Sequence, residues 1–154
     1  MADETLLTLF VSSPGDVRRE RERVDLIVER LNAEYQGRAR IQTIRWETSY
    51  YSSHETFQAQ IPEASACDLV LAIFGARLGS PLPESFPAMP SGERYPSGSA
   101  YEVLSAMEAR RQGKGIPDIY VFRRPSALVV SASDTSAVVR FVRGYAICIS
   151  PSAF

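Results

Sequence analysis

Glu102 is the residue of this chain whose type and position raise the sharpest chemical question. It belongs to the stretch SGSAYEVLSAMEARR, three residues after Ser99 and at the start of a predicted helix. In one interpretation the two residues form a capping box, in which Ser99 bonds the backbone of Glu102 and Glu102 returns the bond. In the other, Glu102 is a catalytic carboxylate that faces the positive charge on a ribose as an N-glycosidic bond breaks, or acts as the nucleophile. The two roles are compatible, and the residues alone leave both open.

The motif SSPGD, which begins at Ser12, is a second place with ligand-binding chemistry. Ser13 can cap a helix, Pro14 suits its first turn and Asp16 suits the positive end of its dipole, so a helix start explains the motif fully. The free N–H groups of a helix start can also hold a phosphate, and Gly15 allows close approach. Ser12, Ser13 and Gly15 are therefore candidate ligand contacts. No Gly-Lys-Ser/Thr follows, which argues against a P-loop and ATP hydrolysis.

Further candidates stand in segments that follow or begin predicted strands. Trp46, Tyr50 and Tyr51 belong to a polar, aromatic loop, where their rings could stack on a nicotinamide or adenine ring or form an assembly surface. Arg77 follows a strongly apolar run and suits a diphosphate, with a surface salt bridge as the alternative. Asp68 begins the same run, where a solvated strand end is the simpler interpretation.

The segments around these candidates alternate between strand and helix patterns. Short apolar runs rich in strand formers predict buried strands, whereas apolar residues at helical spacing predict helices. The clearest helical pattern is an apolar stripe opposite the charged sequence RRERER. The stripe consists of Val17, Val24, Ile27, Val28, Leu31 and Tyr35. In chain order we predict a strand at 5–13, a helix through the stripe, a strand at 40–46, a short helix at 57–65, a strand at 67–75, a helix from Ser99 to Gly113 and a strand at 117–124.

This alternation predicts an α/β domain with a parallel sheet and helices on both faces. In such sheets a ligand lies at the carboxyl ends of the strands, where the strand order reverses. The sequences SSPGD, WETSYY, FGARLG and SGSAYE fall at these ends, so we expect the fold to bring them together. The segment 76–99 is rich in Pro, Gly and Ser, and a loop of this length is usually functional or disordered.

Composition and charge exclude several classes of protein. The 154 residues suffice for one domain, and the formal net charge of -1 gives no electrostatic case for nucleic acid. Cys67 and Cys148 lie far apart and His54 is the only histidine, so we expect neither a metal site nor a disulfide framework. No apolar run reaches the roughly 20 residues of a membrane span, and no signal-peptide pattern opens the chain. We therefore expect a cytoplasmic protein without a membrane partner.

Two blocks of the sequence, taken together, resemble a known family. The first is FVSSPGDVRRERERVDLIVERLN, and the second comprises FQAQIPEASACDLVLAIFGARLGSPL and SGSAYEVLSAMEA. They resemble the TIR-like domains at the N-termini of many bacterial STAND-type NTPases, a group catalogued as a domain of unknown function. The resemblance implies a flavodoxin-like fold, with a five-stranded parallel sheet and helices on both faces, in a domain spanning 1–124. Residues 125–154 match less well, and VVRFVRGYAICIS within them is a candidate last strand of the same domain.

The resemblance also implies an activity. Relatives in the wider TIR superfamily cleave the nicotinamide–ribose bond of NAD with a glutamate on the helix after the third strand, and Glu102 is the matching position. Nucleoside 2-deoxyribosyltransferases are similar over CDLVLAIF and SGSAYEVLSAMEA, and they also break an N-glycosidic bond with this glutamate. The chain departs from TIR hydrolases at Ala100 and Tyr101, where those enzymes commonly carry an aromatic or cysteine pair.

We therefore expect an effector or signalling domain of a bacterial defence-type protein, fused to an NTPase or sensor region and self-associating through TIR-like surfaces. NAD or a related nucleotide is the expected substrate, with Glu102 catalytic and no metal or separate cofactor. The expected ligand contacts are Ser12, Ser13, Gly15, Trp46, Tyr50, Arg77 and Ser99. Two alternatives stay open: a non-catalytic interaction and self-association module, in which Glu102 only caps its helix, and a deoxyribosyltransferase-like enzyme.

Overall fold

Strands and helices alternate along the chain in the computed structural model, as the sequence patterns predict. The structure describes residues 3–45, 64–113 and 115–124. Its elements are β1 (Thr5–Ser12), the 3-10 turn η1 (Gly15–Val17), α1 (Arg18–Glu34), β2 (Ala39–Ile44), the 3-10 turn η3 (Ala64–Ala66), β3 (Leu69–Phe74), α3 (Gly98–Arg111) and β4 (Asp118–Arg123).

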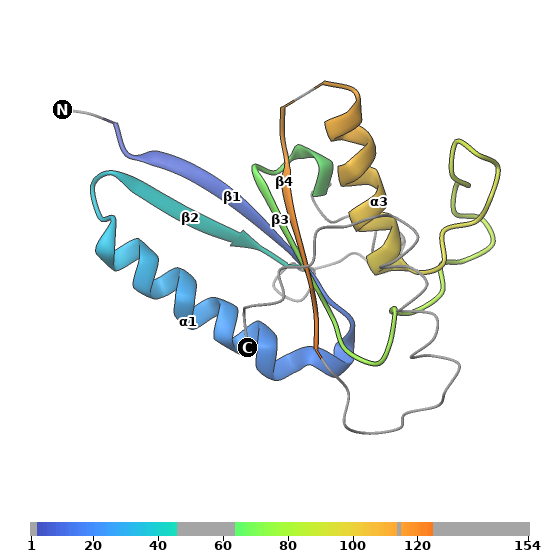
Figure 1. Cartoon of the computed structure of the whole chain (residues 1–154), viewed down its shortest axis with the longest axis horizontal. Helices are drawn as coiled ribbons and strands as arrows, with labels where there is room; N and C mark the ends of the chain where they lie inside the picture. The colour runs from blue at the N-terminus through green and yellow to red at the C-terminus, as the bar shows by residue number, and fades with distance from the viewer. Residues whose placement is uncertain (1–2, 46–63, 114, 125–154) are drawn as a thin grey trace.

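The four described strands form one parallel sheet in the order β2-β1-β3-β4 (Figure 1). β1 pairs on both sides, so that Phe10 lies beside Ile44 of β2 and beside Val70 of β3. The predicted α/β class and parallel sheet are confirmed for these strands. The predicted fifth strand falls in residues 125–154, and most of the predicted helix at 57–65 falls in residues 46–63; both ranges lie outside the described residues.

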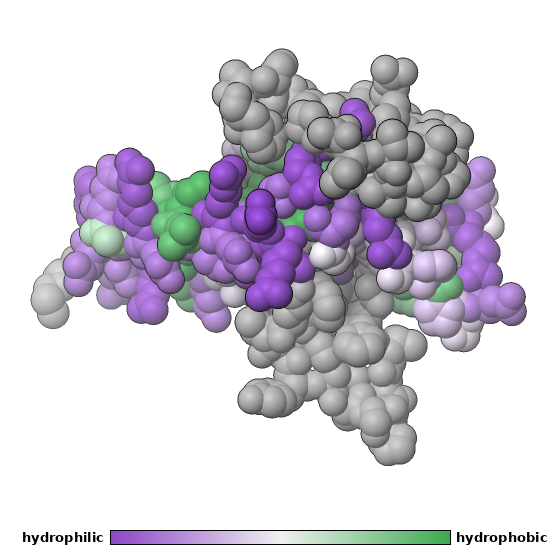
Figure 2. All heavy atoms as spheres, turned by 90° about the horizontal axis from the view of Figure 1, so that it is seen from below, coloured by the Kyte–Doolittle hydropathy of each residue, from purple (hydrophilic) through white to green (hydrophobic). Residues whose placement is uncertain are grey.

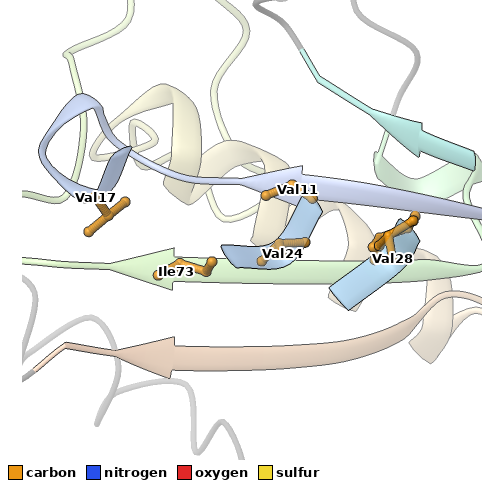
Figure 3. Packing of buried hydrophobic residues seen from close by; sticks show 6 residues of the cluster. Val11, Val17, Val24, Val28 and Ile73 are labelled. Carbon is orange, nitrogen blue, oxygen red and sulfur yellow. The ribbon is translucent and has the colours of Figure 1, made fainter. Parts of the chain in front are cut away.

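α1 covers one face of the sheet. Alternate residues of a strand point to the same face, so Leu9 and Val11 of β1 lie on the side where Ile73 of β3 also lies. Val24 and Val28, one helical turn apart on α1, pack against this surface (Figure 3). Val17 of η1 completes the cluster and is fully buried. Burial of each of these side chains stabilises the fold by about 1.5–3 kcal/mol.

The predicted apolar stripe is correct at its centre and wrong at its margins. Val24 and Val28 are buried, but Ile27 is 57% exposed and Tyr35 is 42% exposed. Ile27 lies at the edge of the stripe because each residue turns the helix by about 100°, and Tyr35 follows the last residue of α1. Arg21, predicted on the solvated charged face, is buried at the opposite margin. The buried face of α1 is therefore narrower than the sequence pattern and is displaced toward Arg21.

α3 and η3 cover the opposite face of the sheet. Phe10, Val70, Ala72, Phe74 and Val121 point to this side from three strands, and Ala100, Val103 and Ala106 of α3 pack against them. The small alanines let the helix backbone lie close to the strands, where dense packing is favourable. This close approach brings the first turns of α3 next to the carboxyl end of β1 (Figure 1).

Aromatic residues organise the long segment between β3 and α3. Phe86, Tyr95 and Tyr101 meet edge to face, with ring centroids 4.8–6.3 Å apart. Arg94 adds hydrogen bonds to the carbonyl oxygens of Leu82 and Pro83. Because Tyr101 belongs to α3, these rings fasten the Pro-rich loop to the helix that carries Glu102.

At the end of the sheet where the parallel strands begin, its amino edge, Asp68 ties the start of β3 to β1. Its Oδ2 accepts hydrogen bonds from the backbone N–H and the hydroxyl of Thr8, both at 2.7 Å. The Asp68 N–H donates in return to Thr8 Oγ1 at 3.0 Å. The bonds from Thr8 lower the pKa of Asp68. Asp68 is therefore a structural clamp, and it stands at the amino edge, away from the carboxyl ends of the strands.

The substitution Asp68→Ala should lower the free energy of unfolding at pH 7 by about 1–3 kcal/mol, because Thr8 loses its acceptor. The lowered pKa means that the bound carboxylate stabilises the fold at neutral pH, and this contribution is lost as the pH falls through the folded-state value. Urea unfolding at pH 7 and at pH 2 measures both effects. Asp118→Ala, which removes an exposed carboxylate from the same edge, is the control, and equal losses in the two variants at pH 7 would contradict the clamp.

Candidate active site at the carboxyl edge of the sheet

Glu102 contacts the carboxyl end of β1 through a short hydrogen bond. The hydroxyl of Ser12, the last residue of β1, donates to Glu102 Oε2 at 2.6 Å across 90 positions of sequence. Ser12 is fully buried and Glu102 is 8% exposed. The Ser12 oxygen also lies 3.5 Å from the carbonyl oxygen of Ser99. The fold therefore brings together Ser12, Ser99 and Glu102, three of the residues that the sequence indicated.

The predicted capping box is wrong. The N-cap of α3 is Ser97, whose Oγ accepts a hydrogen bond from Ala100 N at 3.1 Å and donates to the carbonyl of Leu78 at 2.8 Å. Ser97 and Ser99 are equivalent cap candidates in the sequence SGS, and the hydrogen bond to Leu78 holds Ser97 in the capping position. The residue that would return the bond to Ser97 is Ala100, which has no acceptor. Glu102 lies two residues farther along and has no part in capping.

Burial controls the protonation of Glu102. Removal from water raises the pKa of its carboxyl group to about 7, and the hydrogen bond from Ser12 opposes this shift. The group is therefore divided between its acid and carboxylate forms near neutral pH. A side chain in this state can donate or accept a proton, or face a developing positive charge, without a change of pH.

The segment after β1 differs from the predicted cap. η1 follows Pro14 and has no side-chain cap, and α1 begins only at Arg18, so the prediction that Ser13 caps a helix is wrong. Ser13 is 5% exposed, and within the described part of the chain its hydroxyl has no hydrogen-bond partner. Gly15 is exposed, with open space where a Cβ would stand. Ser13 and Gly15 stay candidate ligand contacts.

The other candidates have separate outcomes. Arg77 is exposed and follows β3 at the same edge as Ser12. Trp46 and Tyr50 lie outside the described residues, so their predicted stacking on a base stays a prediction. Asp16 makes a contact that the sequence did not predict. Its carboxylate accepts hydrogen bonds from the backbone N–H groups of Ala76 and Arg77. A glycine directly after the apolar strand, Gly75, was the only signal of a close approach there.

Within the described ranges, neither a cluster of metal-ligating side chains nor a membrane-crossing helix is found. There, no group of three or more His, Cys, Asp or Glu side chains is placed to hold a metal ion. Within the same ranges, no helix combines the length and apolar character needed to cross a bilayer.

Comparisons of the chain with protein families, with curated proteins and with solved structures found no match. The candidate site therefore has to be interpreted from its own geometry.

Replacement of Glu102 by glutamine should stabilise the protein at high pH. Because the pKa of Glu102 is raised from its usual 4.5 to about 7, the folded state holds a proton that the unfolded chain has released between these values. Stability therefore falls as the pH rises through this window. At pH 8 Glu102→Gln should exceed the wild type by roughly 1–3 kcal/mol, with a smaller difference at pH 5. Denaturant unfolding at both pH values measures this difference, with Glu108→Gln on the same helix as the control. If Glu102→Gln were less stable than the wild type at pH 8, burial of the carboxylate would not be costly.

Loss of the Ser12 hydroxyl should raise the pKa of Glu102 above about 7, because the bond from Ser12 favours the charged form. A carbon-13 NMR titration of the Glu102 carboxyl in Ser12→Ala measures the shift directly. Ser105→Ala is the matched control, since the Ser105 hydroxyl donates to the backbone carbonyl of Glu102 and not to its carboxylate. An unchanged midpoint in Ser12→Ala would show that the 2.6 Å contact does not govern the proton.

Proposed function

We propose that this chain is a TIR-like, flavodoxin-like domain that cleaves the N-glycosidic bond of NAD or a related nucleotide, with Glu102 as the catalytic carboxylate. The observation that carries the proposal is the buried Glu102 side chain at the carboxyl edge of the sheet, bonded to Ser12 and free of any capping role. The strand order β2-β1-β3-β4 supports the flavodoxin-like class, whose sheet order is 2-1-3-4-5.

The proposed reaction breaks the bond between the anomeric carbon of ribose and the nicotinamide nitrogen. The electron pair of that bond leaves with the ring, which becomes neutral nicotinamide, and positive charge develops on the ribose. Glu102 in its carboxylate form stabilises this charge, most strongly where water is excluded. Water then adds to the ribose carbon and releases a proton. The pKa of about 7 supports this role, since a carboxylate population exists at neutral pH while the surroundings stay poorly solvated.

Each of the remaining predicted contacts would bind a different part of the substrate. Ser99 lies beside the Ser12–Glu102 pair, which suits the ribose. Ser13 offers a hydroxyl with no partner in the described part of the chain, and Gly15 leaves open space beside it. Arg77 would bind the diphosphate, and Trp46 and Tyr50 would stack on a base. The wider proposal, from the resemblance, is a cytoplasmic bacterial defence protein in which this domain is fused to an NTPase or sensor region.

A specific observation favours a second candidate function, a non-catalytic self-association module. α1 exposes two adjacent large apolar side chains, Leu26 at 65% and Ile27 at 57%. The described surface in Figure 2 is mostly hydrophilic with smaller apolar areas, and exposed apolar groups of this kind are common at protein interfaces. This surface belongs to α1, which covers the face of the sheet opposite to α3 and Glu102, so the two functions are compatible.

Nicotinamide release from NAD tests the proposal. The wild type at high concentration should release nicotinamide, and Glu102→Gln should do so at least about 100-fold more slowly, because it cannot stabilise the charged ribose. Glu108→Gln should retain the wild-type rate. Circular dichroism confirms that each variant is folded.

Self-association without any loss of NAD, even when the domain is clustered on a surface, would replace the hydrolase with the interaction module. Exchange of the base without net loss of NAD would instead indicate a transferase.

A further inference from the structure

Asp16 contacts the loop that follows β3, although 60 positions separate it from Ala76. Its Oδ2 accepts hydrogen bonds from the backbone N–H of Ala76 at 2.8 Å and from that of Arg77 at 3.3 Å. Hydrogen bonds to a charged acceptor are stronger than those between neutral groups. The carboxylate therefore holds the start of the loop against η1, the turn that carries Asp16.

Gly75 is the residue that this contact requires. A Cβ at Gly75 would lie 2.4 Å from Asp16 Oδ2 and 2.9 Å from Val17 Cγ1. Real Cβ atoms do not approach other atoms so closely, and Val17 is fully buried and cannot withdraw freely. Any larger residue would push the carboxylate away from Ala76 and Arg77. The contact of Asp16 in η1 with the loop after β3 therefore depends on a glycine at position 75.

The next residues of the same loop, Leu78 and Ser80, hold the start of α3. The carbonyl of Leu78 accepts a hydrogen bond from Ser97 Oγ at 2.8 Å, and the carbonyl of Ser80 accepts one from Gly98 N at 3.1 Å. The first residues of the loop are thus tied to η1 through Ala76 and Arg77, and to the helix of Glu102 through Leu78 and Ser80. Arg77 takes part in the first attachment through its backbone N–H, and its side chain is exposed.

We propose that Asp16 is a positioning residue, which fixes this loop as one wall of the Glu102 site and holds Arg77 where it binds the diphosphate of a dinucleotide. The substrate class rests on the function proposed above. A guanidinium matches phosphate oxygens through paired donors, so its position matters as much as its charge. Fixing the loop in the free protein removes the ordering cost that a mobile loop would impose on binding.

Backbone hydrogen exchange tests the attachment without any ligand. In Asp16→Ala the amides of Ala76 and Arg77 should exchange about 10–100-fold faster, while those of the core strands keep their protection. In Asp16→Asn the exchange rates of these amides should lie between those of the wild type and of Asp16→Ala, since the amide oxygen accepts a hydrogen bond without carrying a charge. Gly75→Ala should act like Asp16→Ala, and the double variant should add little to either.

Glu22→Ala, which removes an exposed carboxylate from α1, should leave these amides unchanged. Unchanged exchange in both Asp16→Ala and Gly75→Ala would overturn the attachment.

Ligand measurements test the role in recognition. Asp16→Ala should bind ADP-ribose about tenfold more weakly by calorimetry and raise the KM for NAD with little change in kcat. Hydrolysis of nicotinamide riboside, which has no phosphate, should stay at the wild-type KM. Equal ADP-ribose affinity in the wild type and in Asp16→Ala would overturn the diphosphate role. If no variant releases nicotinamide, the proposed hydrolysis fails, whereas ADP-ribose binding and amide exchange still decide the role of Asp16.

Discussion

β1 pairs with strands on both sides, and the arrangement of the carboxyl edge depends on this pairing. Because β1 and β3 are parallel neighbours, the residues after Ser12 and those after Phe74 emerge at the same edge. Two short polar contacts then join segments that are distant in sequence. Ser12 reaches Glu102 on α3, and Asp16 reaches the backbone of Ala76 and Arg77. Without the β1–β3 pairing neither contact has a partner.

Two acids at opposite ends of the same sheet have pKa values shifted in opposite directions, and their surroundings explain the difference. Asp68 at the amino edge accepts two hydrogen bonds from Thr8 and keeps access to water, so its pKa falls. Glu102 at the carboxyl edge is buried with one donor, so the cost of desolvation prevails and its pKa rises. The first arrangement stabilises the fold. The second destabilises it at neutral pH, which is typical of functional rather than structural carboxylates.

The helix that carries Glu102 is held from several directions. Alanines bring it close to the sheet, Ser97 attaches its first turn to Leu78, and Tyr101 joins it to the aromatic loop residues. A buried acid keeps a defined geometry only when its backbone is fixed in this way. The exposed apolar pair on α1, Leu26 and Ile27, belongs to the opposite side of the sheet, so assembly and chemistry would use different surfaces.

The sequence by itself determined the class of fold and the place of the candidate site in it. Apolar runs of strand formers, the valines of α1 and the position of SSPGD and SGSAYE were enough to predict a parallel α/β sheet with Ser12 and Glu102 at one edge. It could not decide that Ser97 rather than Ser99 caps α3, that Ile27 is exposed and Arg21 buried, or that Asp16 holds a loop 60 positions away. Local patterns report the neighbours of a residue along the chain. Which carboxylate is bonded, buried or raised in pKa depends on which segments the sheet brings together, and only the tertiary structure decides that.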